Sequence, residues 1–208
     1  MPSKPFQQYP PRYREQSPLK SICVFCGSNT GMHPEFITAA MDLGKELCNR
    51  KIQLIYGGGS TGLMGALANS VLEGGGHVTG VIPRGLATPE IAHQKIQRME
   101  LVDTMHQRKM LMHEYSDALI ALPGGYGTFE ELLEAITWLQ LGLSLKPVGL
   151  LNIRGYYDPL LKQFDRARSE GFIRPEFGDL VVSSTLVNDL IPSLQSTTLP
   201  HSTLWNVD

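Results

Sequence analysis

The segment PGGYGTFEE, residues 123–131, combines a glycine-rich turn with acidic residues at an expected helix start. Glycine lets the backbone approach a ligand closely, and the free N–H groups of a helix's first turn attract an anion such as phosphate. Thr128 and Glu131 also fit a capping box, in which two side chains satisfy backbone N–H groups reciprocally. Glu130 would support the helix N-terminus through the helix dipole. On this local pattern alone, a structural role for Glu131 is favoured over a catalytic one.

Arg108 and Lys109, which precede the expected strand before this turn, favour a catalytic role for the segment. They lie in DTMHQRKMLMHEYS, residues 103–116, which we expect to form a helix capped by Asp103. Methionine and leucine side chains lie one turn away from them and form an apolar face. An arginine directed toward such a face usually has an anionic partner. For Lys109, a solvated helix face is a strong alternative.

Two further glycine-rich loops follow apolar runs, CGSNTG at 26–31 and YGGGSTGLMG at 56–65. Each loop alone is a weak signal, because tight turns often use glycine for geometry alone. Three such loops at one edge of a sheet favour a ligand that carries phosphate.

The loop at 57–62 also satisfies G-x-G-x-x-G, the fingerprint of dinucleotide-binding proteins. That fingerprint needs an acidic residue about 20 positions further on to hold the ribose. Pro83 and Arg84 stand in that neighbourhood, so NAD binding is disfavoured. A P-loop is excluded because no G-K-[ST] follows a glycine loop.

Continuous apolar runs alternate with segments of helical spacing along the chain. We expect strands in SICVFCG, KIQLIYGGG, HVTGVIP, QRMELVD, DALIALP, PVGLLNI and DLVVSS. The expected helices cover about 34–50, 61–76, 103–116, 128–141, 157–170 and 186–195. This alternation predicts a parallel sheet covered on both faces, a Rossmann-like doubly wound α/β fold. Ligands of such folds bind at the carboxyl ends of the strands.

Length and composition indicate one domain. The chain has 208 residues, 42% of them hydrophobic, and we expect the domain at 19–196, between a proline-rich tail at 1–18 and a second tail at 197–208. A formal net charge of −2 gives no reason to expect nucleic acid as a partner. No apolar run approaches the roughly 18 residues of a membrane helix. The N-terminal segment also lacks the apolar stretch of a signal peptide.

Cys23 and Cys26 form a C-x-x-C, but no second pair or histidine cluster completes a zinc site, and we expect no metal. Within a strand, residues three apart point to opposite faces, which favours two small buried side chains. The total of three cysteines, without a secretion signal, indicates the reducing cytoplasm.

MHQRK at 105–109 and PGGYGTFEE at 123–131 together resemble the signature of the LOG ("lonely guy") family. These are cytokinin riboside 5′-monophosphate phosphoribohydrolases, often mislabelled as lysine decarboxylases. The family's P-G-G-x-G-T-x-x-E is met at every position, and so is its upstream R-K. The resemblance covers about residues 21–194. It implies a Rossmann-like homodimer, or a larger assembly, that needs no cofactor to release an adenine-type base and ribose 5-phosphate from a nucleoside 5′-monophosphate.

The resemblance also implies which residues form the site. Arg108 and Glu131 match the family's catalytic pair. Its substrate contacts fall on Glu90, Arg108, Lys109, Gly124, Gly125, Tyr126, Gly127, Thr128, Phe129, Glu130, Glu131 and Thr137. Ser28 and the Gly57–Gly59 loop, with Gly58 and Gly59 as its expected contacts, would complete the nucleotide pocket. The N–H groups of the glycine loop, with Thr128, would hold the phosphate. The segment around Glu90, ATPEIAHQKIQRME, departs from the family's usual pattern.

These residue types suit the cleavage of a ribosyl C–N bond, which passes through an oxocarbenium-like state. A carboxylate near the ribose stabilises the positive charge, binds ribose hydroxyls or activates water, and we assign that part to Glu131. Arg108 either assists departure of the base or fixes the phosphate and the carboxylate. A pyridoxal-dependent lysine decarboxylase is disfavoured, because it needs a Schiff-base lysine in a much larger constellation.

Two alternatives stay open. One is a general AMP or purine-monophosphate nucleosidase, which differs only in the base that it accepts. The other is a non-catalytic nucleotide carrier or sensor, as in relatives that carry molybdenum cofactor.

The helix at 128–141 is apolar on more than one face, which indicates burial within the monomer. The resemblance implies that this helix also lies at the dimer interface.

Overall fold

A computed structural model describes residues 18–199; the expected tails at 1–18 and 197–208 lie almost entirely outside them. Within the described residues, seven strands form one sheet: β1 Ser21–Phe25, β2 Gln53–Tyr56, β3 Val78–Pro83, β4 Arg98–Val102, β5 Ala118–Ala121, β6 Val148–Leu151 and β7 Val181–Ser184. The α-helices there are α1 Pro34–Asn49, α2 Gly62–Glu73, α3 Met105–Glu114, α4 Tyr126–Gln140, α5 Asp158–Ser169 and α6 Val187–Ser196. Short 3-10 helices follow β3 (η1, Arg84–Leu86), follow β6 (η2, Ile153–Gly155) and precede β7 (η3, Pro175–Phe177).

The strands pair in parallel in the order β4-β3-β2-β1-β5-β6-β7, which confirms the Rossmann-like doubly wound fold. The chain adds β2, β3 and β4 on one side of β1 and then returns to add β5, β6 and β7 on the other. The direction of winding therefore reverses between β1 and β5. Ligands of open α/β sheets bind at such a switch point, outside the carboxyl ends of the strands.

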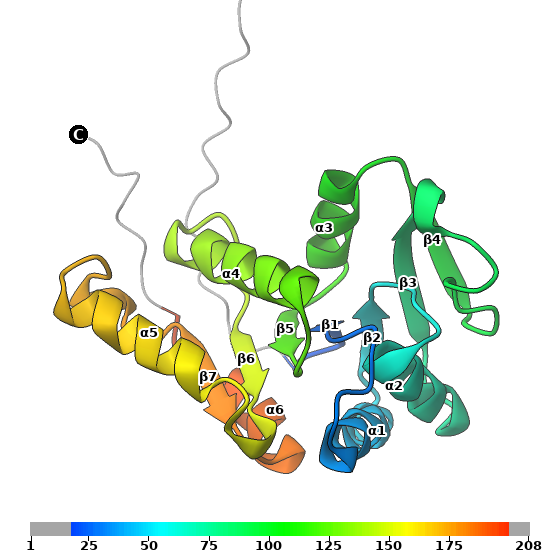
Figure 1. Ribbon diagram of the computed structural model, residues 1–208, viewed down its shortest axis with the longest axis horizontal. Coiled ribbons are helices and arrows are strands. Elements are labelled where there is room, and N and C mark those ends of the chain that lie inside the picture. The colour runs from blue at the N-terminus through cyan, green and yellow to red at the C-terminus, as the bar shows by residue number, and fades with distance from the viewer. Residues whose placement is uncertain (1–17, 200–208) are drawn as a thin grey trace, which may run out of the picture.

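Helices cover both faces of the sheet, with α1 and α2 on one side and α3 and α4 on the other (Figure 1). The core under α1, α2 and α6 includes Leu43 and Leu190, and the core under α3, α4 and α5 includes Met112 and Leu132. None of the helices in the described part of the chain is both long and apolar enough to cross a bilayer.

The C-x-x-C cysteines divide between these two cores. Cys23 belongs to the core under α3 and α4, whereas Cys26 belongs to the core under α1 and α2. Both are free thiols and buried. The prediction of two small buried side chains on opposite faces of a strand is confirmed.

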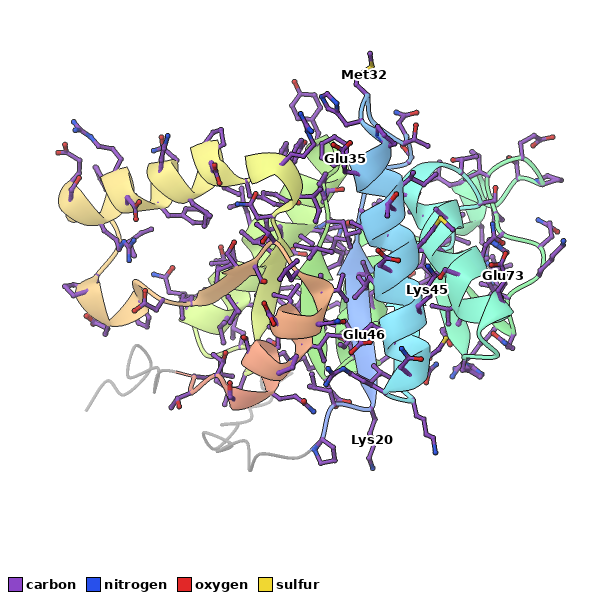
Figure 2. The ribbon with its side chains drawn as sticks, turned by 90° about the horizontal axis from the view of Figure 1, so that it is seen from below. Lys20, Met32, Glu35, Lys45, Glu46 and Glu73 are labelled. Carbon is purple, nitrogen blue, oxygen red and sulfur yellow. The ribbon has the colours of Figure 1, made fainter. Side chains whose placement is uncertain are left out.

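The ends of β1 show where the carboxyl edge of the sheet lies. Lys20 precedes β1 and Met32 follows the loop after it, and Figure 2 shows these two side chains at opposite ends of the molecule. The glycine loops after β1, β2 and β5 all lie toward the Met32 end, because the strands are parallel.

The helix α3 begins one residue later than the sequence predicted. Its N-cap is Thr104, whose hydroxyl oxygen accepts from the N–H of Gln107 at 3.1 Å. In return the Gln107 side chain accepts from the N–H of Thr104 at 3.2 Å, which completes a capping box. The expected cap at Asp103 was therefore wrong, because only Thr104 has a glutamine three residues further on. Asp103 instead forms an ion pair with Arg84 at 3.1 Å.

Candidate active site

The three glycine loops lie at one edge of the sheet, as the sequence predicted, and hydrogen bonds join them beside the switch point. The N–H of Gly27, after β1, donates to the carbonyl of Pro123, after β5, at 3.0 Å. The carbonyl of Gly27 accepts from the N–H of Leu63, at the start of α2, at 3.1 Å. The hydroxyl of Thr61 donates to the Ser28 carbonyl at 3.2 Å, while Ser28 itself is exposed. These bonds fix the loops relative to one another.

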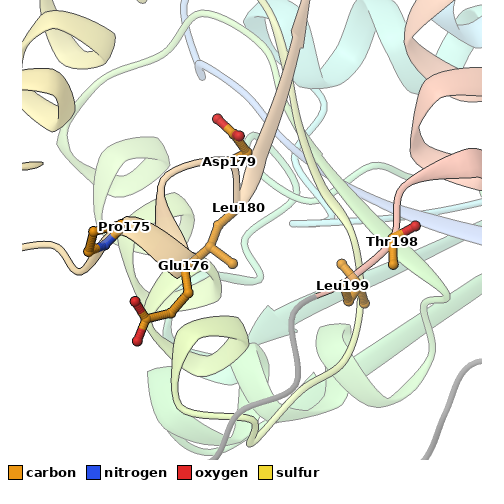
Figure 3. A pocket seen from close by; sticks show the side chains of 6 residues that line it. All are labelled: Pro175, Glu176, Asp179, Leu180, Thr198 and Leu199. Carbon is orange, nitrogen blue, oxygen red and sulfur yellow. The ribbon is translucent and has the colours of Figure 1, made fainter.

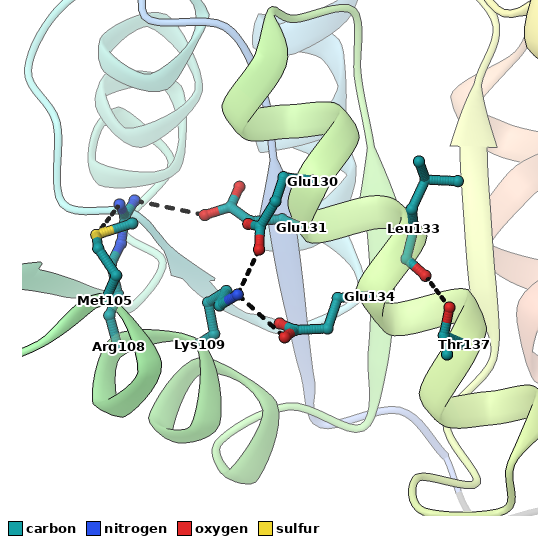
Figure 4. Close-up of polar contacts among 8 residues, drawn as sticks. All are labelled: Met105, Arg108, Lys109, Glu130, Glu131, Leu133, Glu134 and Thr137. Atoms are coloured by element: carbon teal, nitrogen blue, oxygen red, sulfur yellow. Dashed lines mark hydrogen bonds and ion pairs between the residues drawn. The ribbon is translucent and has the colours of Figure 1, made fainter.

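Arg108 on α3 and Glu131 on α4 point toward each other (Figure 4). Nη2 of Arg108 lies 3.7 Å from Oε1 of Glu131, and the two side chains are only 14% and 10% exposed. The same nitrogen donates to the carbonyl of Gly57 at 3.4 Å. The sequence predicted an anionic partner for Arg108, and that prediction is confirmed.

Burial dominates the ionisation of Glu131. It raises the pKa of the carboxyl from 4.5 to about 7, and the positive charge of Arg108 opposes this only in part. The neighbouring carboxylates of Glu130 and Glu134 raise that pKa further, while Lys109 lowers it. Glu131 can therefore hold or release a proton near neutral pH, as a general acid or base must.

Arg108 carries a buried donor that its surroundings do not satisfy. Its Nε has no hydrogen-bond partner within residues 18–199. Buried donors without acceptors cost free energy and are rare, and a catalytic role is one of the reasons for which a protein keeps them.

Gly57 makes the position of Arg108 possible. A Cβ at this residue would lie 2.1 Å from Nη2 of Arg108, so any larger side chain would displace the guanidinium. We expected the whole Gly57–Gly59 loop to border the nucleotide pocket, with Gly58 and Gly59 as its contacts. Their Cβ positions face Met99 and Met64 instead, so the loop meets Arg108 through Gly57.

Lys109 joins α3 to α4 through two carboxylates. Its ammonium group donates to Glu130 and, at 3.0 Å, to Oε1 of Glu134 (Figure 4). Lys109 is only 9% exposed, so the alternative of a solvated helix face was wrong. Sequence reasoning missed Glu134, although its position four residues after Glu130 places both acids on one helix face.

The start of α4 differs from the prediction in a way that changes the roles of two glutamates. The N-cap is Gly125, without a side-chain cap, so Thr128 lies inside the helix and the capping box expected for Thr128 and Glu131 does not form. Glycines at 125 and 127 let the helix begin earlier than the threonine. No acidic residue lies in its first turn, so Glu130 pairs with Lys109 and does not support the N-terminus as expected.

The glycine loop itself is open at its tip. A Cβ added at Gly125 or Gly127 would meet no atom within 4 Å, and Tyr126 between them is 94% exposed. Gly124 is different, because a Cβ there would lie 2.1 Å from the hydroxyl oxygen of Thr128. Thr128 is buried against the loop that it was predicted to serve.

Glu90, Thr137 and Phe129 were also predicted contacts, and in the described part of the chain the bonds and ring contacts that hold them join them to residues other than Arg108 and Glu131. Glu90 is exposed, and its loop is held to the β2 loop through a bond from the Ser60 hydroxyl to the Glu90 carbonyl at 3.2 Å. The Thr137 hydroxyl donates to the carbonyl of Leu133 at 2.7 Å, about three turns along α4 from Gly125 and Gly127. Phe129 packs on Tyr156.

A hollow elsewhere on the surface holds none of the predicted residues. It is lined by Pro175, Glu176, Asp179, Leu180, Thr198 and Leu199 (Figure 3). Within residues 18–199, no group of three or more histidine, cysteine, aspartate or glutamate side chains is placed to hold a metal ion.

Fold and site together define a class: a doubly wound α/β protein with linked glycine loops and a buried arginine–glutamate pair at its switch point. The family described as "Possible lysine decarboxylase" matches residues 64–194. Individual relatives are more informative about the activity than this family description. The probable cytokinin riboside 5′-monophosphate phosphoribohydrolase LOGL1 of Oryza sativa subsp. japonica is 53% identical over 180 residues, which are 86% of this chain and 81% of the relative. The cytokinin riboside 5′-monophosphate phosphoribohydrolase LOG1 of Arabidopsis thaliana is 52% identical over 86% of this chain and 84% of its own.

The chain belongs to the LOG family of cytokinin riboside 5′-monophosphate phosphoribohydrolases. Among solved structures, the molybdenum cofactor carrier protein of Chlamydomonas reinhardtii matches with a TM-score of 0.63 and 23% identity. That match covers 84% of this chain and 95% of the carrier. At this low identity, the likeness shows a shared fold alone.

Proposed function

We propose that this protein hydrolyses the N-glycosidic bond of cytokinin nucleoside 5′-monophosphates. The products are a free adenine-type base and ribose 5-phosphate. The observation that carries the proposal is the buried pair of Arg108 and Glu131 beside the glycine loops, in a chain 53% identical to a relative with this activity in its name. Both residues match positions of the signature by which the sequence resembles the family.

Glu131 and Arg108 have distinct parts in the proposed reaction. Water adds to C1′ of the ribose while the C1′–N bond breaks and its electron pair leaves with the base. Ionised Glu131 stabilises the positive charge on the sugar and takes the proton from the attacking water. Arg108 orients this carboxylate and donates toward the negative charge that develops on the base or is carried by the phosphate. The proton from water then passes to the departing base, so the reaction is balanced.

The phosphate fits the start of α4. Gly125 and Gly127 are open to a ligand, and the first N–H groups of the helix have no partner within it. Thr128 lies next to these groups and would complete the phosphate site. Ser28 and the β2 loop, which the hydrogen bonds described above join to this turn, would border the nucleotide.

A homodimer in the cytoplasm completes the proposal. Apolar side chains remain 42–48% exposed on β4, α3 and α4, at Leu101, Met105, Met110 and Leu133. A second copy would cover them and would include α4 in the interface, as the sequence led us to expect. Light scattering at micromolar concentration tests the assembly, with a mass of two chains expected.

The cytoplasmic location rests on the odd number of cysteines.

Product analysis tests the activity. Purified protein is mixed with N6-isopentenyladenosine monophosphate and with AMP, and free base and ribose 5-phosphate are measured by chromatography. The matching nucleosides are the phosphate-free controls. Base released from the monophosphates alone supports a phosphoribohydrolase, and the ratio of the two rates separates cytokinin activation from general AMP hydrolysis. No base from any compound, with nucleotide still raising the melting temperature, would favour the carrier or sensor.

A further inference from the structure

Each of the three carbonyl groups that lead into the glycine loop has its own donor. The hydroxyl of Tyr157 donates to the carbonyl of Leu122 at 2.6 Å, and the N–H of Gly27 donates to the carbonyl of Pro123 at 3.0 Å. The hydroxyl of Tyr156 donates to the carbonyl of Gly124. Two consecutive tyrosines, which lie between η2 and α5 in the chain, thus hold the backbone on which α4 begins.

The segment around these tyrosines is itself tightly held. Arg154 and Gly155, both within η2, have positive φ values of 56° and 69°, which turn the chain toward α5. Arg154 reaches α1 through an ion pair with Glu35 at 2.6 Å. The Asn152 side chain accepts from the N–H of Tyr157 at 2.7 Å. The hydroxyl groups of both tyrosines are therefore presented from a fixed backbone.

Packing fixes the ring of Tyr156 as well. It stacks on Phe129 of α4, with ring centroids 6.2 Å apart and an angle of 5° between the planes. Phe36 of α1 meets it edge-on at 6.0 Å. These contacts do not involve the hydroxyl, so a phenylalanine at position 156 would keep them.

The orientation of one peptide gives the Tyr156 hydroxyl its importance. In a trans peptide the C=O and the following N–H point in opposite directions. A fixed Gly124 carbonyl therefore fixes the N–H of Gly125, in a turn where glycine would otherwise allow the peptide to rotate. The Gly125 N–H belongs to the open loop tip at the start of α4, where the proposed function places the phosphate.

We propose that Tyr156 is a positioning residue, whose hydroxyl orients the Gly124–Gly125 peptide so that its N–H faces the phosphate of the nucleotide. This proposal rests on the proposed function for the location of the phosphate. It predicts that loss of the hydroxyl selectively weakens the binding of ligands that carry phosphate, because the loop must then be ordered at the moment of binding.

The test compares two variants that each lose one tyrosine hydroxyl. Tyr156→Phe frees the Gly124 carbonyl, whereas Tyr157→Phe frees the carbonyl of Leu122, two residues earlier. Tyr157 is fully buried, so Tyr157→Phe should lower the melting temperature at least as much as Tyr156→Phe does. The probe is ribose 5-phosphate, measured by calorimetry, because its binding can be read without any turnover.

We expect Tyr156→Phe to lower the affinity for ribose 5-phosphate about 5-fold to 10-fold, which is the effect of one lost hydrogen bond. The KM for the monophosphate substrate should rise by a similar factor with kcat nearly unchanged. Tyr157→Phe should change the affinity by less than about 2-fold.

Two results would overturn the positioning role. One is an unchanged affinity in Tyr156→Phe, or no binding of ribose 5-phosphate by the wild type. The other is an equal loss of affinity in both variants, which would mean that affinity simply follows stability. A wild type that binds ribose 5-phosphate but hydrolyses neither monophosphate would overturn the proposed function alone and leave the positioning role standing.

Discussion

Arg108 and Glu131 face each other at 3.7 Å, which is about 1 Å longer than a tight charge-assisted hydrogen bond. The same guanidinium nitrogen also donates to the carbonyl of Gly57 at 3.4 Å, and burial of Glu131 outweighs the stabilising charge of Arg108. The result is a carboxyl with a pKa of about 7 instead of 4.5. A tighter ion pair would lower that pKa and reduce the basicity that the proposed reaction needs.

The stability of the fold should depend on pH through Glu131. Between the unfolded pKa of 4.5 and the folded pKa of about 7, the folded state keeps a proton that the unfolded state releases. This contribution is fully present below pH 4.5 and is lost as the pH rises through 7. From pH 5 to pH 8, we expect the wild type to lose on the order of 3 kcal/mol of unfolding free energy relative to Glu131→Gln. Urea unfolding of both proteins at each pH measures this, and a constant difference would contradict the raised pKa.

Activity should also depend on pH through Glu131, but it should rise with pH over the range in which stability falls. Only ionised Glu131 can take a proton from water, so we expect kcat/KM to fall about tenfold per pH unit below about 7. The substrate phosphate titrates near 6, about one unit lower. A pH profile whose only acidic inflection lies near 6 would report the substrate and would exclude Glu131 as the base.

Gly57→Ala should displace the guanidinium of Arg108 without unfolding the chain, because the clashing atom is the end of a flexible side chain. We expect kcat/KM to fall about 100-fold, as when one donor to a transition state is lost, with a small change in melting temperature. Gly85→Ala is the matched control, since its Cβ would meet no atom within 4 Å. Equal activity in both variants would show that the position of Arg108 is not critical.

Lys109→Met should reduce stability by leaving the carboxylates of Glu130 and Glu134 without their shared cation. We expect a loss on the order of 1–2 kcal/mol in urea unfolding, moderated by the partial exposure of Glu130. Lys45→Met is the control, because Lys45 pairs with Asp42 on the exposed face of α1 and should cost less than about 0.5 kcal/mol. The acid limb of the activity profile should also move to higher pH in Lys109→Met, since Lys109 lowers the pKa of Glu131. An unmoved limb would confine Lys109 to a structural role.

The sheet could be predicted from the sequence because buried parallel strands appear as continuous apolar runs. All seven expected strands form, even β4 and β7, which lie at the edges of the sheet. Helix starts were less predictable. Thr128 resembles a cap, but the glycines before it let α4 begin at Tyr126, and no local pattern distinguishes these two starts.

Contacts between distant segments were the other part that the sequence did not show. The Arg108–Glu131 pair was predictable from an arginine near an apolar face and a family signature. The contact between Gly57 and Arg108 spans 51 residues, and that between Tyr156 and Gly124 spans 32. Neither contact follows from a spacing along the chain. Two adjacent tyrosines before a helix were the only local signal of the second contact.

The most direct test of the proposed mechanism is the rate of base release from N6-isopentenyladenosine monophosphate at pH 8 by the wild type and Glu131→Gln. The melting temperature of each protein is measured in the same buffer. We predict that the wild type releases base, and that the variant is slower by about 100-fold or more while melting no lower. A variant that keeps its rate, or that loses rate and stability together, would contradict the assignment of Glu131 as the reacting carboxylate.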